Sequence, residues 1–413
     1  MAHTEVDTQS RPRAFYADLT DRALRDEPFT EAELTALLVD PSIELFSLLH
    51  AAYEVRLANF GKTVQVHILN NAQNGRCPED CSYCTQAKTS EAGIEPYAMK
   101  PADEVLAEAE RAYNAGAHRY CMVFSGRGPS DKRTDQLAGL VKEIKTKFPS
   151  LEVCVSAGLL DEPKAQKLAD AGLDRLNHNL NTSRDRYGTI CTTHTYDDRV
   201  NTLRAAQKAG LSKCSGLIVG LGEPPEEVVE VATTLRELGA ESIPVNFLLP
   251  FEGNAMNIPH IGGRNGEKTS GGLTPEYCLR VLCMFRLCCP TSEVRCAAGR
   301  EFHLRSLEPM CLQPANSLFL DGYLNGMGAE RQRTYAMIRD AGFEIESDHA
   351  VDELLGDLPG DVDPASRSEL TVGGRPAMKG IEELRPTATE PLPGATGTKK
   401  RRRIPGDQPT TLA

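Results

Sequence analysis

Residues 64–86 read VQVHILNNAQNGRCPEDCSYCTQ, a strand pattern that runs straight into a loop with three cysteines. Residues 64–69 alternate apolar and polar side chains, which predicts a β-strand. Gly75 and Pro78 argue against regular helix or strand in residues 74–86. The loop carries a C-x3-C-x2-C spacing at Cys77, Cys81 and Cys84, so three thiolates can bind one metal ion or cluster.

The spacing of these cysteines favours an iron–sulfur cluster over a zinc ion. A structural zinc site usually has four protein ligands in two C-x2-C pairs, and no fourth Cys or His lies close in the sequence. A four-iron cluster accepts three cysteines and can leave one iron open. The remaining alternative is three thiols that bind no metal. The spacing, the turn residues and the position after a strand together favour the cluster.

Composition narrows the class of protein. The chain has 413 residues, is 40% hydrophobic and 25% charged, and carries a formal net charge of −12. Such a charge argues against a broad surface for nucleic acid or for an anionic membrane. Thirteen cysteines without a repeated secreted-module spacing fit a reducing compartment. With no apolar leader and no long apolar run, we expect a cytoplasmic protein.

Beyond the first strand, short apolar segments alternate with helical ones, which predicts an α/β fold. We expect strands at 120–124, 152–155, 174–177, 215–219, 242–247, 293–296 and 317–319, and helices at about 101–115, 131–147, 161–171, 195–209, 225–238, 275–288 and 330–341. About eight βα units over some 280 residues favour a parallel (β/α)8 TIM-type barrel. A doubly wound open sheet is the competing architecture, because alternation alone does not close a barrel.

The chain divides into three parts. Residues 1–60 predict an N-terminal helical segment, with Thr30 as a helix cap. Residues 61–347 form the expected barrel, with the cysteine loop at 74–86. Residues 348–413 are rich in Pro, Gly, Thr and charge, which is typical of a disordered tail; its basic run at 399–403 is more typical of a solvated tail than of a nucleic-acid site. Residues 253–272 predict an enlarged loop at the barrel mouth.

Cysteines also occur on three predicted strands or at their edges, at Cys121, Cys154 and Cys214. Taken singly, each is typical of a small buried residue. Together they can face one interior, because inward-pointing residues of neighbouring strands stack in layers. Arg295 on a late strand can point there too, and a buried arginine needs an anionic or acceptor partner.

The chain resembles the biotin synthase family of the radical S-adenosylmethionine (SAM) superfamily. The resemblance covers about residues 40–345 and is carried by CPEDCSYC with TQAKTSEAGIEPY, and then in order by RYCMVFSGRGPSD, NHNLNTS, TTHTYDDRVNTL, CSGLIVGLGE, SIPVNF, LTPEYCLRVLC and VRCAAGRE. The resemblance implies sulfur insertion into dethiobiotin to give biotin, the last step of biotin biosynthesis, by a sulfurtransferase that uses the 5′-deoxyadenosyl radical. It implies a [4Fe-4S] cluster on Cys77, Cys81 and Cys84, and a sulfur-donating [2Fe-2S] cluster on Cys121, Cys154, Cys214 and Arg295, with Arg300 as the alternative arginine.

The same resemblance implies the remaining contacts. SAM would contact Tyr83, Asn179, Asn181, Ile218 and Val219, and dethiobiotin would contact Asn177 and Asn246. Many family members carry Asp at the position of Asn181. A flavodoxin or ferredoxin type electron donor and a homodimer are also implied. The rival interpretations are another radical SAM barrel, which would not need the second set of ligands, and an iron or zinc binding protein without catalysis.

Overall fold

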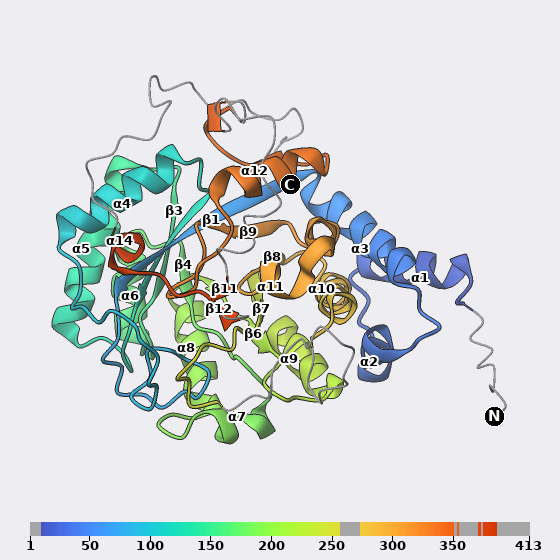
Figure 1. Ribbon diagram of the computed structural model, residues 1–413, viewed down its shortest axis with the longest axis horizontal. Helices are drawn as coiled ribbons and strands as arrows, with labels where there is room; N and C mark the ends of the chain where they lie inside the picture. Colours follow the sequence, from blue (N-terminus) through green and yellow to red (C-terminus); the bar gives the residue numbers. More distant parts are fainter. Residues whose placement is uncertain (1–9, 257–272, 351–352, 355–370, 373–374, 386–413) are drawn as a thin grey trace, which may run out of the picture.

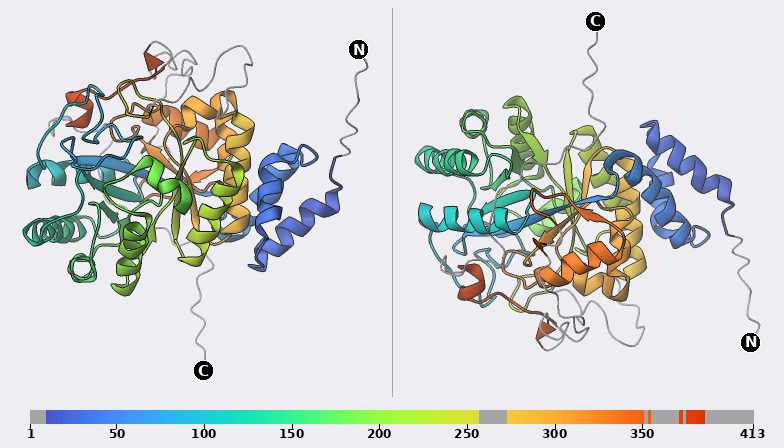
Figure 2. Two further views of the ribbon diagram at one scale, coloured as in Figure 1. Left: turned by 90° about the horizontal axis from the view of Figure 1, so that it is seen from below. Right: turned by 90° about the horizontal axis from the view of Figure 1, so that it is seen from above.

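The computed structural model describes residues 10–256, 273–350, 353–354, 371–372 and 375–385. Three N-terminal helices lie to one side of the main body: α1 (Arg13–Leu24), α2 (Glu31–Val39) and α3 (Leu45–Phe60) (Figures 1 and 2). Thr30 caps α2 in a capping box with Glu33, as the sequence predicts. The apolar faces of these helices pack against a helix of the main body, α10 (Pro275–Cys288).

The main body is a closed barrel of parallel strands. Its strands are β1 (Thr63–Gln73), β2 (Arg119–Phe124), β3 (Glu152–Ser156), β4 (Arg175–Asn177), β5 (Ser212–Cys214), β6 (Leu217–Val219), β7 (Ser242–Phe247), β8 (Glu293–Cys296) and β9 (Ser317–Leu320). Each strand pairs with a neighbour in parallel, and β9 returns to pair with β1, with Gln65 opposite Ser317. This last pairing closes the sheet and excludes the open, doubly wound alternative.

The fifth strand position of the barrel, which we call the fifth stave, is occupied by two short strands, β5 and β6. The sequence predicts one strand over 215–219, which covers β6 but misses β5. β5 and β6 both pair with β7 but are separated by Ser215 and Gly216. A Cβ atom on Gly216 would lie 1.9 Å from the carbonyl oxygen of Pro244, so the two backbones approach too closely for any other residue. At this break the Gly216 N–H donates to the side chain of Asn179 (3.1 Å), and the Gly216 carbonyl accepts from the Asn181 N–H (3.0 Å).

Helices surround the barrel and are drawn outside the strands in Figure 1. They are α4 (Ala102–Asn114), α5 (Asp131–Lys147), α6 (Glu162–Asp170), α7 (Arg184–Ile190), α8 (Tyr196–Lys208), α9 (Pro225–Glu237), α10, α11 (Arg300–Leu304), the 3-10 helix η1 (Arg305–Leu312) and α12 (Arg331–Asp340). The sequence predicted α5 and α10 with these same bounds. The main apolar core lies between the helices and the strands. A separate small cluster packs three cysteines, Cys121, Cys154 and Cys214, with Phe319 and Tyr323.

After α12, β10 (Glu344–Ile345) pairs with the start of β1. Further on come β11 (Thr371–Val372), its antiparallel partner β12 (Arg375–Pro376), and α14 (Ile381–Leu384). Residues 377–385 contact the barrel: the backbone N–H of Lys379 donates to the carbonyl of Asn325 (2.8 Å). Most of the predicted tail, and residues 257–272 of the predicted mouth loop, lie outside the described residues.

Candidate active site

The loop cysteines, which we define as Cys77, Cys81 and Cys84, follow the C-terminal end of β1 and line a cavity of about 380 Å³ inside the barrel. Their loop folds back on itself because the N–H of Cys77 donates to the Gln86 carbonyl (3.3 Å) and the N–H of Cys84 donates to the Cys81 carbonyl (3.0 Å). Gly75 takes a left-handed conformation (φ 71°) just before the first cysteine. All three thiols therefore border one space.

Deeper in the same cavity lie the interior thiols, which we define as Cys121, Cys154 and Cys214 on β2, β3 and β5. Cys121 and Cys154 are direct register partners. Arg295 on β8 places its Nη1 atom 3.8 Å from the Sγ atom of Cys214. Hydrogen bonding from Cys154 lowers the pKa values of Cys121 and Cys214, and the charge of Arg295 lowers them further against the effect of burial. Cys121 and Cys214 are therefore biased toward thiolate, the form that ligates metals. The pKa of Cys154 shifts the other way, well above its ordinary range, because its hydrogen bonds to Cys121 and Cys214 and its burial favour the thiol.

These deep groups fit an iron–sulfur cluster. Arg295 is 1% exposed, yet its Nε atom has no hydrogen-bond partner. A buried donor without a partner is costly, so this atom indicates a missing acceptor in the cavity. Sulfur ligands and sulfide acceptors would satisfy both the thiols and the guanidinium group.

A row of asparagines lines the wall between the two sets of cysteines. Asn177 places its Nδ2 atom 3.2 Å from the Cys214 sulfur. Asn179 accepts a hydrogen bond from the Gly216 N–H (3.1 Å) at the break in the fifth stave. Asn181 is held in a left-handed conformation (φ 70°) and hydrogen-bonds the hydroxyl of Tyr83. Asn246 on β7 accepts from the Ala298 N–H (3.2 Å). Tyr83 and all four asparagines line the cavity, as does Ile218.

Two residues named from the sequence lie elsewhere. Val219 is fully buried in the outer core, because neighbouring residues of a strand face opposite sides, and its side chain does not line the cavity that Ile218 lines. Arg300 directs its guanidinium group to Glu308 (3.3 Å) and to the Phe319 carbonyl (2.9 Å). The geometry therefore favours Arg295 over Arg300 as the arginine beside the interior thiols.

Sequence reasoning missed a chain of hydrogen bonds behind the loop cysteines. Glu79 and the Nδ1 atom of His194 lie 2.5 Å apart, and Arg199 lies 2.9 Å from Nε2 of the same ring. Arg199 also donates to the Asn179 carbonyl (2.7 Å). This chain joins the cysteine loop to the asparagine wall. Its members occur in the quoted blocks CPEDC and TTHTYDDR, but nothing in their spacing indicates that they meet.

Cys191 forms a second thiol contact in this region. Its Sγ atom lies 3.7 Å from Cys81 Sγ and 3.3 Å from Nδ1 of His194, so three possible metal ligands lie together. Arg199 can only donate to Nε2, which leaves the ring proton on Nδ1, where it is donated to Glu79. His194 therefore has no free lone pair for a metal ion in this arrangement, and its role is to support the loop.

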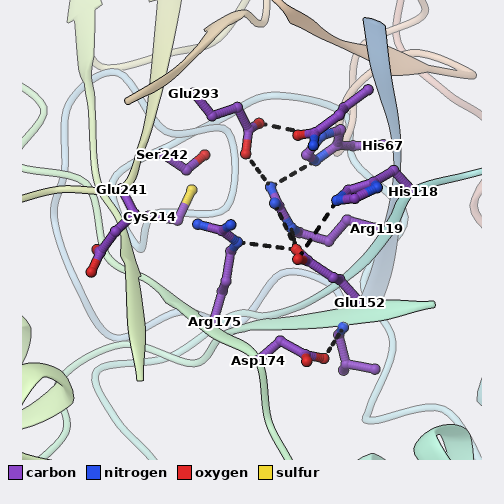
Figure 3. A network of polar contacts seen from close by, with 12 residues as sticks. His67, His118, Arg119, Glu152, Asp174, Arg175, Cys214, Glu241, Ser242 and Glu293 are labelled. Atoms are coloured by element: carbon purple, nitrogen blue, oxygen red, sulfur yellow. Dashed lines mark hydrogen bonds and ion pairs between the residues drawn. The ribbon is translucent and has the colours of Figure 1, made fainter. Parts of the chain in front are cut away.

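Beneath the interior thiols lies a polar layer, which we call the polar floor: His67, Arg119, Glu152, Arg175, Ser242 and Glu293 (Figure 3). Glu152 and Arg175 are half-buried, and the other four are buried. Arg119, Glu152 and Glu293 each precede a cavity residue by two positions on the same strand, so they point to the same interior one layer further down. Arg119 bridges the two carboxylates, at 2.7 Å from Glu152 and 2.9 Å from Glu293.

The floor and Arg295 together carry a surplus positive charge. Burial opposes ionisation of Glu293, but the charges of Arg119 and Arg295 lower its pKa well below the ordinary range. Burial, reinforced by the same two arginines, lowers the pKa of His67 and keeps that ring neutral. The set of three guanidinium groups and two carboxylates thus has one net positive charge facing the interior thiols. A two-iron core with two sulfides and three thiolates has one net negative charge, which would compensate it.

Two family models match most of the barrel. Residues 74–235 match the radical SAM superfamily, and residues 244–344 match the biotin and thiamin synthesis associated domain. Among curated relatives, the biotin synthase of Magnetococcus marinus is 54% identical over 310 residues, covering 75% of this chain and 93% of the relative. The biotin synthase of Acaryochloris marina is 47% identical over 335 residues, covering 81% and 92%.

Solved structures show the same architecture at lower identity. A methylornithine synthase structure superposes with a TM-score of 0.66 at 21% identity, covering 79% of this chain and 97% of the other. The [FeFe]-hydrogenase maturase of Carboxydothermus hydrogenoformans superposes with a TM-score of 0.65 at 16% identity, covering 82% and 81%. These likenesses concern the fold alone.

Proposed function

The chain belongs to the biotin synthase family, and on that premise we propose that it inserts sulfur into dethiobiotin to give biotin, using a radical derived from SAM. The observation that carries this proposal is that the loop cysteines, the asparagine wall and the interior thiols line one cavity. When bound, an iron–sulfur cluster and SAM would supply the one-electron chemistry needed to remove hydrogen from unactivated carbon, which no side chain does as an acid or base.

The loop cysteines would hold a [4Fe-4S] cluster at the mouth of the cavity. Three thiol ligands leave one iron position for another molecule. The chain of Glu79, His194 and Arg199 supports this role, because it fixes the loop against the asparagine wall. The protein thus contributes the orientation of the loop.

The interior thiols and Arg295 would hold a [2Fe-2S] cluster as the sulfur donor. Three observations support this assignment: the lowered pKa values of Cys121 and Cys214, the unpartnered Nε atom of Arg295, and the surplus positive charge of the polar floor. The rival radical SAM barrels would have no use for this set of groups.

The asparagine wall would bind SAM and the substrate between the two clusters. Asn179 and Asn181 lie nearer to Tyr83 and the break in the fifth stave, which suits the SAM side, with Ile218 against the adenine. Asn177 lies beside Cys214 and Asn246 faces the same cavity, which suits the ureido ring of dethiobiotin. The amides offer both donors and acceptors to that ring. Burial would also shield a radical from solvent.

Three wider properties belong to the same proposal. We infer a flavodoxin or ferredoxin type electron donor and a homodimer from the family. The thirteen cysteines are all free thiols, which is in keeping with a reducing cytoplasm. Within the described residues, no helix is both long and apolar enough to cross a membrane.

The test is an anaerobic incubation of the iron- and sulfide-reconstituted chain with SAM, a strong one-electron reductant and dethiobiotin. We expect 5′-deoxyadenosine and biotin by mass spectrometry. Deoxyadenosine without biotin, from protein shown to hold both clusters, would point to another substrate. Bound zinc without acid-labile sulfide, and neither product, would favour a metal-binding protein without catalysis.

A further inference from the structure

Glu293 lies at the centre of the polar floor and contacts four side chains. Its Oε1 atom accepts hydrogen bonds from Arg295 Nη2 (2.5 Å) and from the Ser317 hydroxyl (2.7 Å), and lies 3.2 Å from Nε2 of His67. Its Oε2 atom accepts from Arg119 (2.9 Å). The carboxylate is 5% exposed, so water scarcely competes with these contacts.

These contacts determine which nitrogen atoms of the Arg295 guanidinium group face the cavity. Both oxygen acceptors of its guanidinium group within the described residues, Glu293 and the Ser242 hydroxyl (2.9 Å), bind the Nη2 atom. The Nη1 atom, 3.8 Å from the Cys214 sulfur, and the unpartnered Nε atom are left on the side of the interior thiols. The side chain also lies over the ring of Phe319, with its carbon 4.9 Å from the ring centre, which limits rotation.

The two carboxylates of the floor, Glu152 and Glu293, pair with different arginines apart from Arg119, which they share. Glu152 pairs with Arg119 and with Arg175 (3.1 Å). Glu293 pairs with Arg119 and Arg295. In the described part of the chain, Glu293 is the one carboxylate in ion-pair contact with Arg295. A buried guanidinium group that loses its carboxylate partner keeps an uncompensated charge, so it would turn toward another acceptor.

We propose that Glu293 is a positioning residue for the sulfur-donating cluster: with Ser242 it holds one end of the Arg295 guanidinium so that Nη1 and Nε face the cluster held by the interior thiols. This inference rests on the proposed function, because it concerns the cluster assigned there. Glu293 itself does not line the cavity and acts through Arg295.

The test compares Glu293→Gln with Glu152→Gln in the full, anaerobically reconstituted chain. Both variants remove one carboxylate charge from the same floor, but only the first removes it from Arg295. For Glu293→Gln we expect a changed visible absorption of the [2Fe-2S] cluster and roughly tenfold faster loss of that cluster after reduction, as for a lost charge-assisted hydrogen bond. Glu152→Gln should keep the wild-type spectrum and lifetime, and both variants should keep the [4Fe-4S] cluster and SAM cleavage.

A second variant keeps the proposal testable if Glu293→Gln does not fold. Ser242→Ala removes the other Nη2 acceptor without touching the carboxylate, and should shift the same spectrum and lifetime by a smaller factor. Equal cluster loss in Glu293→Gln and Glu152→Gln would overturn the proposal, because the floor would then act only through its charge. Wild-type spectra and lifetimes in both Glu293→Gln and Ser242→Ala would also overturn it. Absence of a second cluster from the wild-type chain would instead refute the proposed function on which it rests.

Discussion

At the scale of the residue, the two sets of cysteines predict separable losses. Cys81→Ala should abolish SAM cleavage, because it removes a ligand of the first cluster. Cys154→Ala should retain that cluster and some SAM cleavage but lose biotin formation, because Cys154 lies between the other two interior thiols. Deoxyadenosine and biotin are measured in the same anaerobic assay.

The control for the first variant concerns Cys191, whose sulfur lies 3.7 Å from that of Cys81 and is the nearest spare thiol. The double variant Cys81→Ala/Cys191→Ala removes any substitute ligand and should match an inactive Cys81→Ala. Normal biotin formation by Cys154→Ala would contradict the assignment of the second cluster.

His303 predicts a pH dependence of stability that is separate from the clusters. Burial lowers its pKa from 6.5 to about 4, and its Nε2 donates to the Leu248 carbonyl (2.8 Å). The unfolded chain binds this proton at higher pH than the folded chain, so the stabilisation is complete above about pH 6.5 and is lost as the pH falls toward 4. The loss should total about 3 kcal/mol in the free energy of unfolding.

The measurement is urea unfolding of the full chain between pH 4 and 7 under reducing conditions. His303→Gln keeps a donor for the Leu248 carbonyl but cannot titrate, so its stability should fall less steeply over this range. Identical slopes for the variant and the wild type would show that other groups cause the pH dependence.

The site could be predicted from the sequence where its residues are adjacent in the chain or matched a known block. The loop cysteines stand within eight residues, so their meeting needs no tertiary knowledge. The contact of Glu79 with His194 joins residues 115 positions apart, and depends on how α7 and the segment after it lie against the loop. Nothing local in either segment indicates that pairing.

At the scale of the element, the break between β5 and β6 predicts intolerance of a single methyl group. Gly216→Ala would place Cβ 1.9 Å from the Pro244 carbonyl oxygen, and the backbone at this point holds Asn179 and Asn181. We expect a loss of about 2–3 kcal/mol in the free energy of unfolding and weaker SAM binding, since both backbones would have to move.

The matched control is Gly139→Ala on α5, where a Cβ atom meets nothing within 4 Å. That change should stabilise the chain by about 0.5–1 kcal/mol because alanine is the better helix former. Denaturant unfolding and SAM binding by calorimetry measure both variants. A Gly216→Ala chain as stable as the wild type would mean that the close approach can relax without cost.

Helices and strands could be predicted from the sequence where the element is long, and not where a tertiary contact sets its bounds. α5 and α10 are long helices that begin after capping residues, Ser130 and Thr274, and α5 also shows a periodic apolar face. Of the strand predicted at 215–219, only 217–219 forms one (β6), because Gly216 lies against Pro244, and β5 at Ser212–Cys214 was missed. α7, α11 and η1 were missed because each has too few turns to show a period.

At the scale of the whole molecule, the alternation of strands and helices indicates a parallel sheet, but closure depends on a contact between its ends. β1 and β9 are more than 240 residues apart and pair over four register positions. Closure brings β8, which carries Arg295 and Glu293, into the same interior as β2 and β3 with their cysteines. The second ligand set is therefore a property of the closed barrel. The strand pattern could indicate that these side chains share one interior, but only the family resemblance made them ligands of one cluster.

The segment 377–385 predicts a role for the C-terminal part of the chain at the barrel mouth. Met327 donates its N–H to the Ala377 carbonyl (2.9 Å), and Lys379 donates to Asn325, which lines the cavity next to Gly326. At its far end, the Leu384 carbonyl accepts from Lys100 (2.6 Å), a buried lysine that pairs with Glu108.

A chain ending at residue 350 should therefore be less stable and bind substrate more weakly, whereas a chain ending at Arg385 keeps every one of these contacts. Loss of the buried Leu384 side chain and of the Lys100 hydrogen bond should lower the free energy of unfolding by about 2–3 kcal/mol. Because Asn325 and Gly326 line the cavity, the shorter chain should also show a higher KM for dethiobiotin with a smaller change in kcat. The measurements are steady-state kinetics and denaturant unfolding of the two truncated chains. If both chains behave alike, the segment 377–385 does not shape the mouth of the cavity, and the barrel itself must hold the turn at Asn325.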